Sequence, residues 1–267
     1  MATYIRGHHA SVVASHGART MADSAAYLAP QLRPGMSVLD VGCGPGSITL
    51  DLAAAVAGEG ARVVGVENTS APLELARRNA AQRGDTLVEW ELADAYGLPF
   101  EDGTFDVAHA HQVLQHLADP VAALREMARV TRPGGLVAAR DADYGGMIWY
   151  PPLPGLTRWL DVYRQTARAN NGEPDAARHM LAWAHAAGLT DVQVSTSTWH
   201  YSGDEGRAFW GGQWQKRALE SAFATQSVEA GVATPDELPG IAEAWREWSE
   251  DPDAWFAMLH TEILARI

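Results

Sequence analysis

The sequence has a single cysteine and no long apolar run among its 267 residues. One cysteine, Cys43, excludes an intrachain disulfide and a zinc site built on cysteines. No apolar stretch reaches the roughly 20 residues that a membrane helix needs, and the N-terminal residues 1–19 lack the apolar core of a secretory signal. We therefore expect a cytoplasmic protein with no membrane partner.

Basic charge is also scarce. The formal net charge is −13 and the sequence pI is about 5.1. An acidic surface repels phosphate backbones, which disfavours DNA or RNA as a partner. The hydrophobic share of 47% suffices for a real core. These features favour a globular protein that acts on a small molecule.

Short apolar runs alternate with helical patterns, which is typical of a parallel sheet covered by helices on both faces. The segment 255–264 suits a strand or a helix; we predict a strand because such a sheet needs a seventh. Arg132-Pro-Gly-Gly135 predicts a tight turn before the fifth strand. We expect the other strands at 37–41, 61–66, 87–92, 105–110, 136–140 and 192–198, and helices at 47–57, 71–83 and 120–130.

Three segments exceed the minimal sheet. We expect residues 1–32 to form an N-terminal helical lid, and 144–178 and 203–250 to form helical caps, all within one domain over 1–267. Aromatic and polar side chains in these segments are predicted to contact the substrate, with ordinary core packing as the alternative for the tryptophans. These candidates are Tyr4, His8, His16, Trp149, Trp210 and Trp214. The N-terminal histidines have no recognised metal-ligand spacing, so we predict no metal.

The turn after the first strand carries the clearest chemistry. Asp40 ends a buried strand, and Gly42, Gly44 and Gly46 follow at alternate positions. Glycines permit a sharp turn and a close approach to the backbone. The following helix offers unpaired N–H groups and the positive end of its dipole. This arrangement predicts a site for an adenosine-bearing ligand at the carboxyl edge of the sheet.

The spacing of these glycines separates two classes of enzyme. A dinucleotide fingerprint needs a glycine where Ser47 stands, whereas here the third glycine comes one residue early, as Gly46. With Leu39 and Asp40, the pattern resembles motif I of class I S-adenosylmethionine-dependent methyltransferases. The similarity covers about 35–143 and is nearest to the small-molecule enzymes of ubiquinone and menaquinone biosynthesis. It implies an α/β, Rossmann-like, doubly wound and mostly parallel seven-stranded sheet with helical cap insertions.

The resemblance also implies S-adenosylmethionine as cofactor and indicates its contacts. Glu67, about 20 residues past the glycines, is expected to bind the ribose hydroxyls. Asp94 is expected to face the adenine amino group, and His111 to contact the methionine part through its backbone. The full predicted cofactor set is Asp40, Gly42, Cys43, Gly44, Gly46, Glu67, Asn68, Asp94, Ala95 and His111.

Methyl transfer from a sulfonium is an in-line displacement, and an oxygen or carbon acceptor usually also loses a proton. Histidine is the natural base near neutral pH. His116, His111 and Asp141 are therefore our candidate catalytic residues, and Asp143 our candidate for the substrate cavity, with loop capping as the alternative for the two aspartates. The acceptor and the methylated atom stay open.

Three other functions remain possible on this sequence. A nicotinamide-dependent oxidoreductase is disfavoured by Ser47 at the third glycine position. A protein of the same fold could bind the cofactor without transferring a methyl group. A protein or nucleic-acid methyltransferase is disfavoured because no Asn-Pro-Pro-Tyr-type motif follows the fourth strand. The oligomeric state is left as monomer or homodimer.

Overall fold

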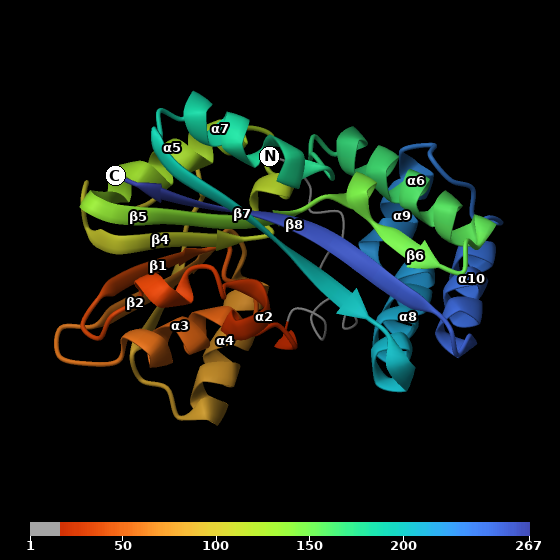
Figure 1. Ribbon diagram of the computed structural model, residues 1–267, viewed down its shortest axis with the longest axis horizontal. Helices are drawn as coiled ribbons and strands as arrows, with labels where there is room; N and C mark the ends of the chain where they lie inside the picture. Colours follow the sequence, from red (N-terminus) through yellow and green to blue (C-terminus); the bar gives the residue numbers. More distant parts are fainter. Residues whose placement is uncertain (1–16) are drawn as a thin grey trace.

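The computed structural model describes residues 17–267 and is organised around one sheet of eight strands (Figure 1). Their order is β3-β2-β1-β4-β5-β8-β6, with β7 paired to the other edge of β8. β1 to β5 run parallel, and β8 is antiparallel to each of its neighbours. The strands are β1 Ser37–Val41, β2 Arg62–Glu67, β3 Val88–Leu92, β4 Phe105–His111, β5 Thr131–Ala142, β6 Ile148–Tyr150, β7 Asp191–Tyr201 and β8 Trp255–Arg266.

Helices cover both faces of the parallel part (Figure 1). One face packs Val38 and Val63 against Leu52 of α3 (Ser47–Val56). The other packs Leu39 against Leu124 of α5 (Pro120–Val130). Successive strand residues point to opposite faces, so both must be apolar to be buried. The remaining helices against this sheet are α2 Met21–Ser24, α4 Ser70–Arg83, α7 Met180–Ala186 and the 3₁₀ turns η1 Ala29–Gln31, η2 Leu114–His116, η3 Tyr144–Gly146 and η4 Ala176–His179.

The predicted α/β architecture is confirmed, including the strand at 255–264, which forms β8. Two details were wrong. The sheet has eight strands instead of seven, because the short strand β6 adds to one edge of β8. Residues 132–135 do not form a separate turn; they belong to β5, whose pairing with β4 shifts register there, and Gly134 has a φ of 80°.

The two predicted cap segments, 144–178 and 203–250, pack together through four helices. These are α6 Pro154–Ala169, α8 Gly203–Glu220, α9 Ala222–Glu229 and α10 Leu238–Glu250, which we call the helical module. The end of β5, Ala142, pairs with His260, so the first residues of β8 project beyond it and pair with β6. The helical module therefore lies past the carboxyl edge of the parallel strands (Figure 1).

Aromatic side chains form the core of the helical module. Trp159 contacts Trp214 and Trp245 edge to face, at ring-centroid distances of 4.6 and 4.8 Å. Trp210 and Trp214 are 3% and 1% exposed, and Trp149 stacks on Phe256. The three tryptophans predicted for a substrate pocket thus pack in or against this core. None of the helices within residues 17–267 is long and apolar enough to span a membrane.

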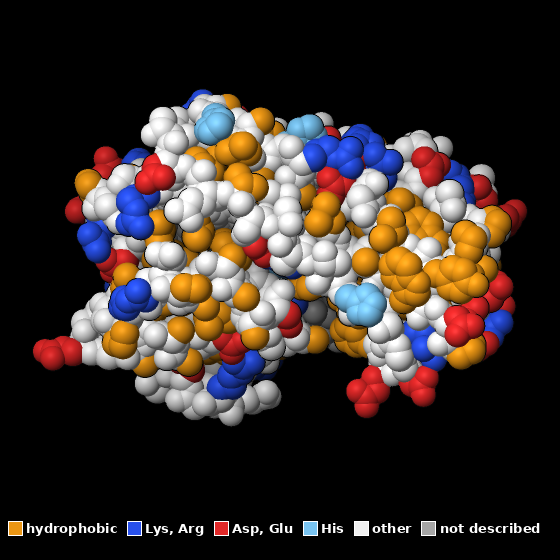
Figure 2. All heavy atoms as spheres, viewed as in Figure 1, with side chains coloured by type: hydrophobic (Ala, Val, Ile, Leu, Met, Phe, Trp, Pro, Cys, Tyr) orange, Lys and Arg blue, Asp and Glu red, His pale blue; other side chains and the backbone are white. Residues whose placement is uncertain are grey.

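Arginines on the surface of the helical module are paired with carboxylates. Arg246 bonds to Glu243 and Glu250, and Arg158 bonds to Asp161 and Glu237. Figure 2 shows blue and red side chains next to each other on this part of the visible face. Such exposed pairs contribute little to stability, so we attribute the stability of the module to its aromatic core.

We predict that Trp214→Ala lowers the free energy of unfolding by about 3–5 kcal/mol, because it leaves a cavity in the aromatic core. Leu219→Ala is the matched control in the same helix, since Leu219 is 46% exposed; its loss should stay within about 0.5 kcal/mol. Urea denaturation followed by far-UV circular dichroism measures both. Equal losses for the two variants would contradict this assignment of the core.

Candidate functional site

The glycine turn connects β1 to the N-terminus of α3. The N–H groups of Gly42 and Cys43 both donate to the carbonyl of Val66, which ties the turn to the end of β2. A Cβ at Gly46 would lie 2.4 Å from the Trp90 ring, so that position needs glycine for packing. A Cβ at Gly44 would meet no heavy atom within 4 Å, so the backbone there faces open space that a ligand could occupy.

Glu67, at the end of β2, lies directly over this open stretch. Its Oε1 accepts the N–H of Gly44 at 2.9 Å and its Oε2 accepts the N–H of Asn68 at 3.2 Å. Burial raises the pKa of the Glu67 carboxyl, and the two hydrogen bonds oppose that rise. The carboxylate is thus held at the rim of the turn, where the sequence predicts the ribose.

Asp94 lies beside Glu67 at the same edge. The N–H of Ala93 donates to the carbonyl of Glu67, which joins the ends of β3 and β2. The Asp94 side chain is exposed, and its Oδ1 accepts the N–H of Tyr96 at 3.0 Å. Asp94 and Ala95 therefore follow the end of β3, at the same edge of the sheet as Glu67, and their contact with the adenine stays a prediction.

Asp40 holds the turn in place from beneath. Its buried carboxylate accepts the hydroxyl of Thr49 at 2.5 Å and the Nδ1–H of His109 at 2.8 Å, which joins β1, α3 and β4. Both oxygens are used within the protein, so Asp40 positions the turn. Cys43 is also buried, and desolvation raises the pKa of its thiol, so this side chain packs under the turn in an unreactive form.

The end of β4 departs from regular geometry. Gln112 has a φ of 53°, in the left-handed region where a non-glycine residue is uncommon. Its N–H donates to the carbonyl of Arg140, and its side chain bridges Arg19 and His260 at 2.8 Å each. The sequence interpretation missed Gln112 and Arg140, since neither belongs to a motif.

His111, just before Gln112, is only 6% exposed. Its imidazole lies 5.6 Å from the Trp199 ring and 6.4 Å from that of His260. Burial, followed by the charges of Arg19 and Arg140, lowers its pKa well below the ordinary value, so the ring is neutral. A neutral ring with a depressed pKa is a weak base.

The other predicted polar residues lie around the end of β5. Asp141 is fully buried, its Oδ2 accepts the N–H of Leu114 at 3.1 Å, and burial raises its pKa to about 7. Asp143 makes a bidentate ion pair with Arg178 at 2.5 and 2.7 Å, so both of its oxygens are used within the protein. His116 ends η2, and its backbone packs against Gly172 after α6.

Three predicted substrate residues, Tyr4, His8 and His16, lie outside the described residues. The described end of the proposed lid, residues 17–32, packs on the α3 face of the sheet through Ala25, Leu28 and Leu32. In residues 17–267, no three His, Cys, Asp or Glu side chains are grouped as a metal site.

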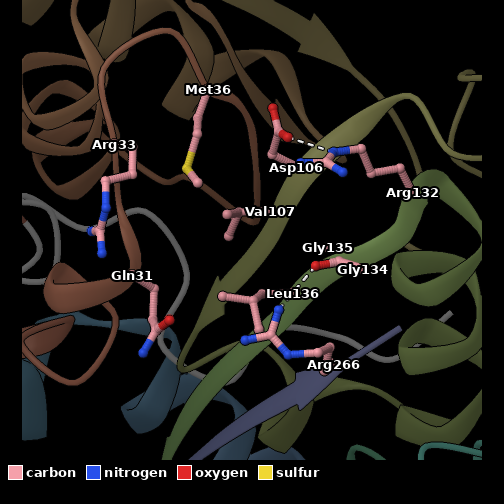
Figure 3. Close-up of a pocket in the computed structure, with 10 residues that line it drawn as sticks. All are labelled: Gln31, Arg33, Met36, Asp106, Val107, Arg132, Gly134, Gly135, Leu136 and Arg266. Atoms are coloured by element: carbon pink, nitrogen blue, oxygen red, sulfur yellow. Dashed lines mark hydrogen bonds and ion pairs between the residues drawn. The ribbon is translucent and has the colours of Figure 1, made fainter.

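A separate pocket of about 210 Å³ lies at the opposite, amino end of the parallel strands (Figure 3). One wall carries the ion pair between Arg132 and Asp106, and Arg266 donates to the carbonyl of Gly134. The pocket is thus at the far end of β1 and β4 from the glycine turn. Its lining residues are Gln31, Arg33, Met36, Asp106, Val107, Arg132, Gly134, Gly135, Leu136 and Arg266.

Comparison with known proteins identifies the family. A model of the methyltransferase domain matches residues 32–216, which include the glycine turn, Glu67 and Asp94. The chain belongs to the methyltransferase domain family. An uncharacterized methyltransferase of Schizosaccharomyces pombe is 34% identical over 98% of this chain and 95% of its own length.

Two further similarities agree with this assignment. A demethylmenaquinone methyltransferase of Symbiobacterium thermophilum is 41% identical over 49% of this chain and 55% of its own length. A phosphoethanolamine N-methyltransferase of Haemonchus contortus, solved with phosphomonomethylethanolamine and S-adenosylhomocysteine, has a TM-score of 0.55 at 16% identity over 88% of this chain and 49% of that chain. The resemblance predicted from the sequence is confirmed.

The pKa of Asp141 predicts a pH effect on stability. It is raised from an ordinary 3.8 to about 7, so the folded state binds this proton more tightly than the unfolded state. The resulting stabilisation is complete below about pH 4 and is lost as the pH rises through about 7. Asp141→Asn lacks this titrating group. Across that pH range the free energy of unfolding of wild type should therefore fall by on the order of 4 kcal/mol relative to that of the variant.

Urea denaturation at several pH values from 4 to 8 measures this difference. Asp253→Asn, in an exposed loop, is the control, and its free energy of unfolding should show the same pH dependence as that of wild type. A constant difference between wild type and Asp141→Asn over the whole range would contradict the buried, proton-binding state of Asp141.

Proposed function

We propose that this protein transfers a methyl group from S-adenosylmethionine to a small-molecule acceptor. The observation that carries the proposal is the contact of Glu67 with the N–H of Gly44, at a place where the glycine backbone is otherwise open. A carboxylate there can accept both ribose hydroxyls, while the N-terminus of α3 contributes the positive end of its dipole.

The neighbouring residues fit the rest of such a cofactor. Asp94 and Ala95 would bind the adenine, Glu67 with Asn68 the ribose, and the backbone of the turn and of His111 the methionine part. Asp40 would act from beneath by holding the turn. When bound, S-adenosylmethionine supplies an electrophilic methyl group; the chain's own task is to orient the acceptor and exclude water.

The proposal requires a general base only if the methyl acceptor binds in its protonated form. Asp141, with a pKa of about 7, has the proton affinity of a base that works near neutral pH. His116 remains the predicted alternative, one turn after β4. His111 is less suited as a base, because its environment disfavours the protonated ring.

We further propose that the acceptor is neither nucleic acid nor membrane-bound, that the protein acts in the cytoplasm, and that it is a monomer or homodimer. The acidic pI of about 5.1 supports the first point. The helical module beyond the carboxyl edge supports an enclosed site, which suits a small acceptor. Size-exclusion chromatography with light scattering tests the oligomeric state.

Glu67→Gln should weaken the binding of S-adenosylhomocysteine about 10- to 100-fold, because it removes the charge that accepts two ribose hydrogen bonds. Isothermal titration calorimetry measures the affinity. Glu74→Gln makes the same chemical change on the exposed side of α4 and should leave the affinity unchanged. Equal effects of the two variants would contradict the ribose assignment.

The competing functions give different outcomes in ligand-binding assays. A ligand that binds only the folded state raises the melting temperature, so S-adenosylhomocysteine should stabilise the protein and NADH should not. The reverse result would favour a nicotinamide-dependent oxidoreductase. Tight cofactor binding without a methylated product across a broad acceptor panel would favour a protein that binds the cofactor for another purpose.

A further inference from the structure

Four side chains on one face of the sheet hold buried polar atoms that have no hydrogen-bond partner in residues 17–267. Native structures leave few such atoms unpaired, so their concentration beside the predicted methionine position calls for an explanation. His111 and Arg140 are direct neighbours in the pairing of β4 with β5. The atoms are Nη1 and Nη2 of Arg140, Nδ1 and Nε2 of His111, Nε2 of His109 and Oη of Tyr27. We call these four residues the Arg140 cluster.

Trp199 of β7 closes the cluster on one side. Its ring lies 5.1 Å from the guanidinium carbon of Arg140 and 5.6 Å from the ring of His111. Its indole N–H donates to the carbonyl of Asp23, which fastens β7 to the N-terminal segment that carries Tyr27. The cluster is thus shielded from bulk water, where polar interactions are stronger than at the surface.

The position of the Arg140 guanidinium is fixed at one end only. Its Nε lies 3.0 Å from the hydroxyl of Ser197 and 3.3 Å from Oε1 of Glu262. Glu262 also accepts the hydroxyls of Ser195 and Ser197 at 2.6 and 2.5 Å, so its charge is spread over several donors. The two terminal nitrogens of Arg140, at 1% exposure, therefore present N–H donors to a partner that the described residues do not supply.

These donors require a partner rich in lone pairs. An arginine has no acceptor and keeps its charge in proteins, and an unpaired buried donor is costly. Burial raises the pKa of the Tyr27 hydroxyl, so it too is a donor at neutral pH. The parallel fork of a guanidinium matches the two oxygens of a carboxylate or the single oxygen of a phenolate.

The order of the strands places the Arg140 guanidinium beside the cofactor position, with which it shares a border at His111. Adenine, ribose and methionine positions follow the ends of β3, β2 and β1, and Arg140 lies two strands further along, in β5. We propose that the Arg140 cluster binds an anionic oxygen of the methyl acceptor, so that the substrate class is a small organic carboxylate or phenolate. This inference rests on the proposed function.

The inference also bears on how an acceptor becomes reactive. Arg140 favours the ionised form of a bound hydroxyl or carboxyl group, because its charge lowers the pKa of that group. An acceptor bound as its anion needs no general base, which agrees with the weakly basic His111. We therefore assign Arg140 as the residue that selects the acceptor, and Tyr27 as a second donor to the same oxygen.

The test measures acceptor binding directly, with the protein saturated with S-adenosylhomocysteine. Ligand-observed NMR titrations compare benzoate with benzamide, and 4-nitrophenolate with nitrobenzene; each pair separates charge from shape. We expect at least one anion to bind about tenfold more tightly than its neutral counterpart, as for a charged hydrogen bond. The pair with the larger difference in affinity shows whether the site prefers a carboxylate or a phenolate.

Arg140→Gln should reduce that ratio to about one, whereas Arg207→Gln should preserve it. Arg207 is a similarly shielded arginine of α8, and its partners are Asp204 and the carbonyl of Pro252. If Arg140→Gln does not fold, Tyr27→Phe removes only one hydroxyl and should weaken the anion about fivefold, within the range for one hydrogen bond.

Each other outcome overturns the inference. If wild type binds neither anion, or binds both members of each pair equally, the Arg140 cluster is solvated by buried water. If Arg140→Gln weakens S-adenosylhomocysteine itself more than about tenfold, the cluster serves the cofactor's carboxylate. Loss of S-adenosylhomocysteine binding by wild type would instead overturn the proposed function, so the two failures are distinguishable.

Discussion

The antiparallel pairing of β8 with β5 connects the two halves of this molecule. Residues 260–266 of β8 pair with residues 136–142 of β5, and residues 255–257 run on to pair with β6. The opposite edge of β8 pairs with β7 along eleven residues. Since β6 and β7 lead into α6 and α8, this one strand places the helical module beyond the carboxyl edge. That edge is also where the glycine turn and the end of β4 lie.

The same edge collects the buried polar groups of the parallel sheet. Parallel strands end together, so Asp40, His111 and Arg140 come close although they are far apart in the chain. The apolar layers on both faces cannot form hydrogen bonds with these polar groups. Each polar group therefore bonds to another polar group of the protein or is available to bind a ligand. Asp40 is hydrogen-bonded to His109, and Glu262 is hydrogen-bonded to Ser195 and Ser197. The terminal nitrogens of Arg140 are instead available to bind a ligand.

Local signals in the sequence predicted most of this architecture. The alternation of apolar runs and helices gave nearly correct bounds for β1 to β4; β1, β2 and β4 are apolar runs buried on both faces, whereas β3 is a partly exposed edge strand. Glu67 ends β2 and Asp94 follows β3, as the predicted strand bounds imply, and their contacts with a cofactor stay predictions. The 255–264 segment was resolved only by an architectural argument, since its local pattern suits a helix equally well.

The sequence could not decide which polar and aromatic residues face a ligand. Trp210 and Trp214 carry the same local pattern whether they line a pocket or fill a core; only the packing of four helices buries them. Asp143 is tied to Arg178, 35 residues away, and Arg140 to Glu262, 122 residues away. Neither partner is marked by a motif.

By itself, then, the sequence determined the parallel sheet, the glycine turn after β1 and the family, because these depend on short-range spacing and on the burial of apolar residues. Only the tertiary structure decided which buried polar side chains come together at the ends of β4 and β5. That choice depends on the register between strands distant in sequence and on water being excluded by β7 and the N-terminal segment. Both are long-range effects that no window of neighbouring residues contains.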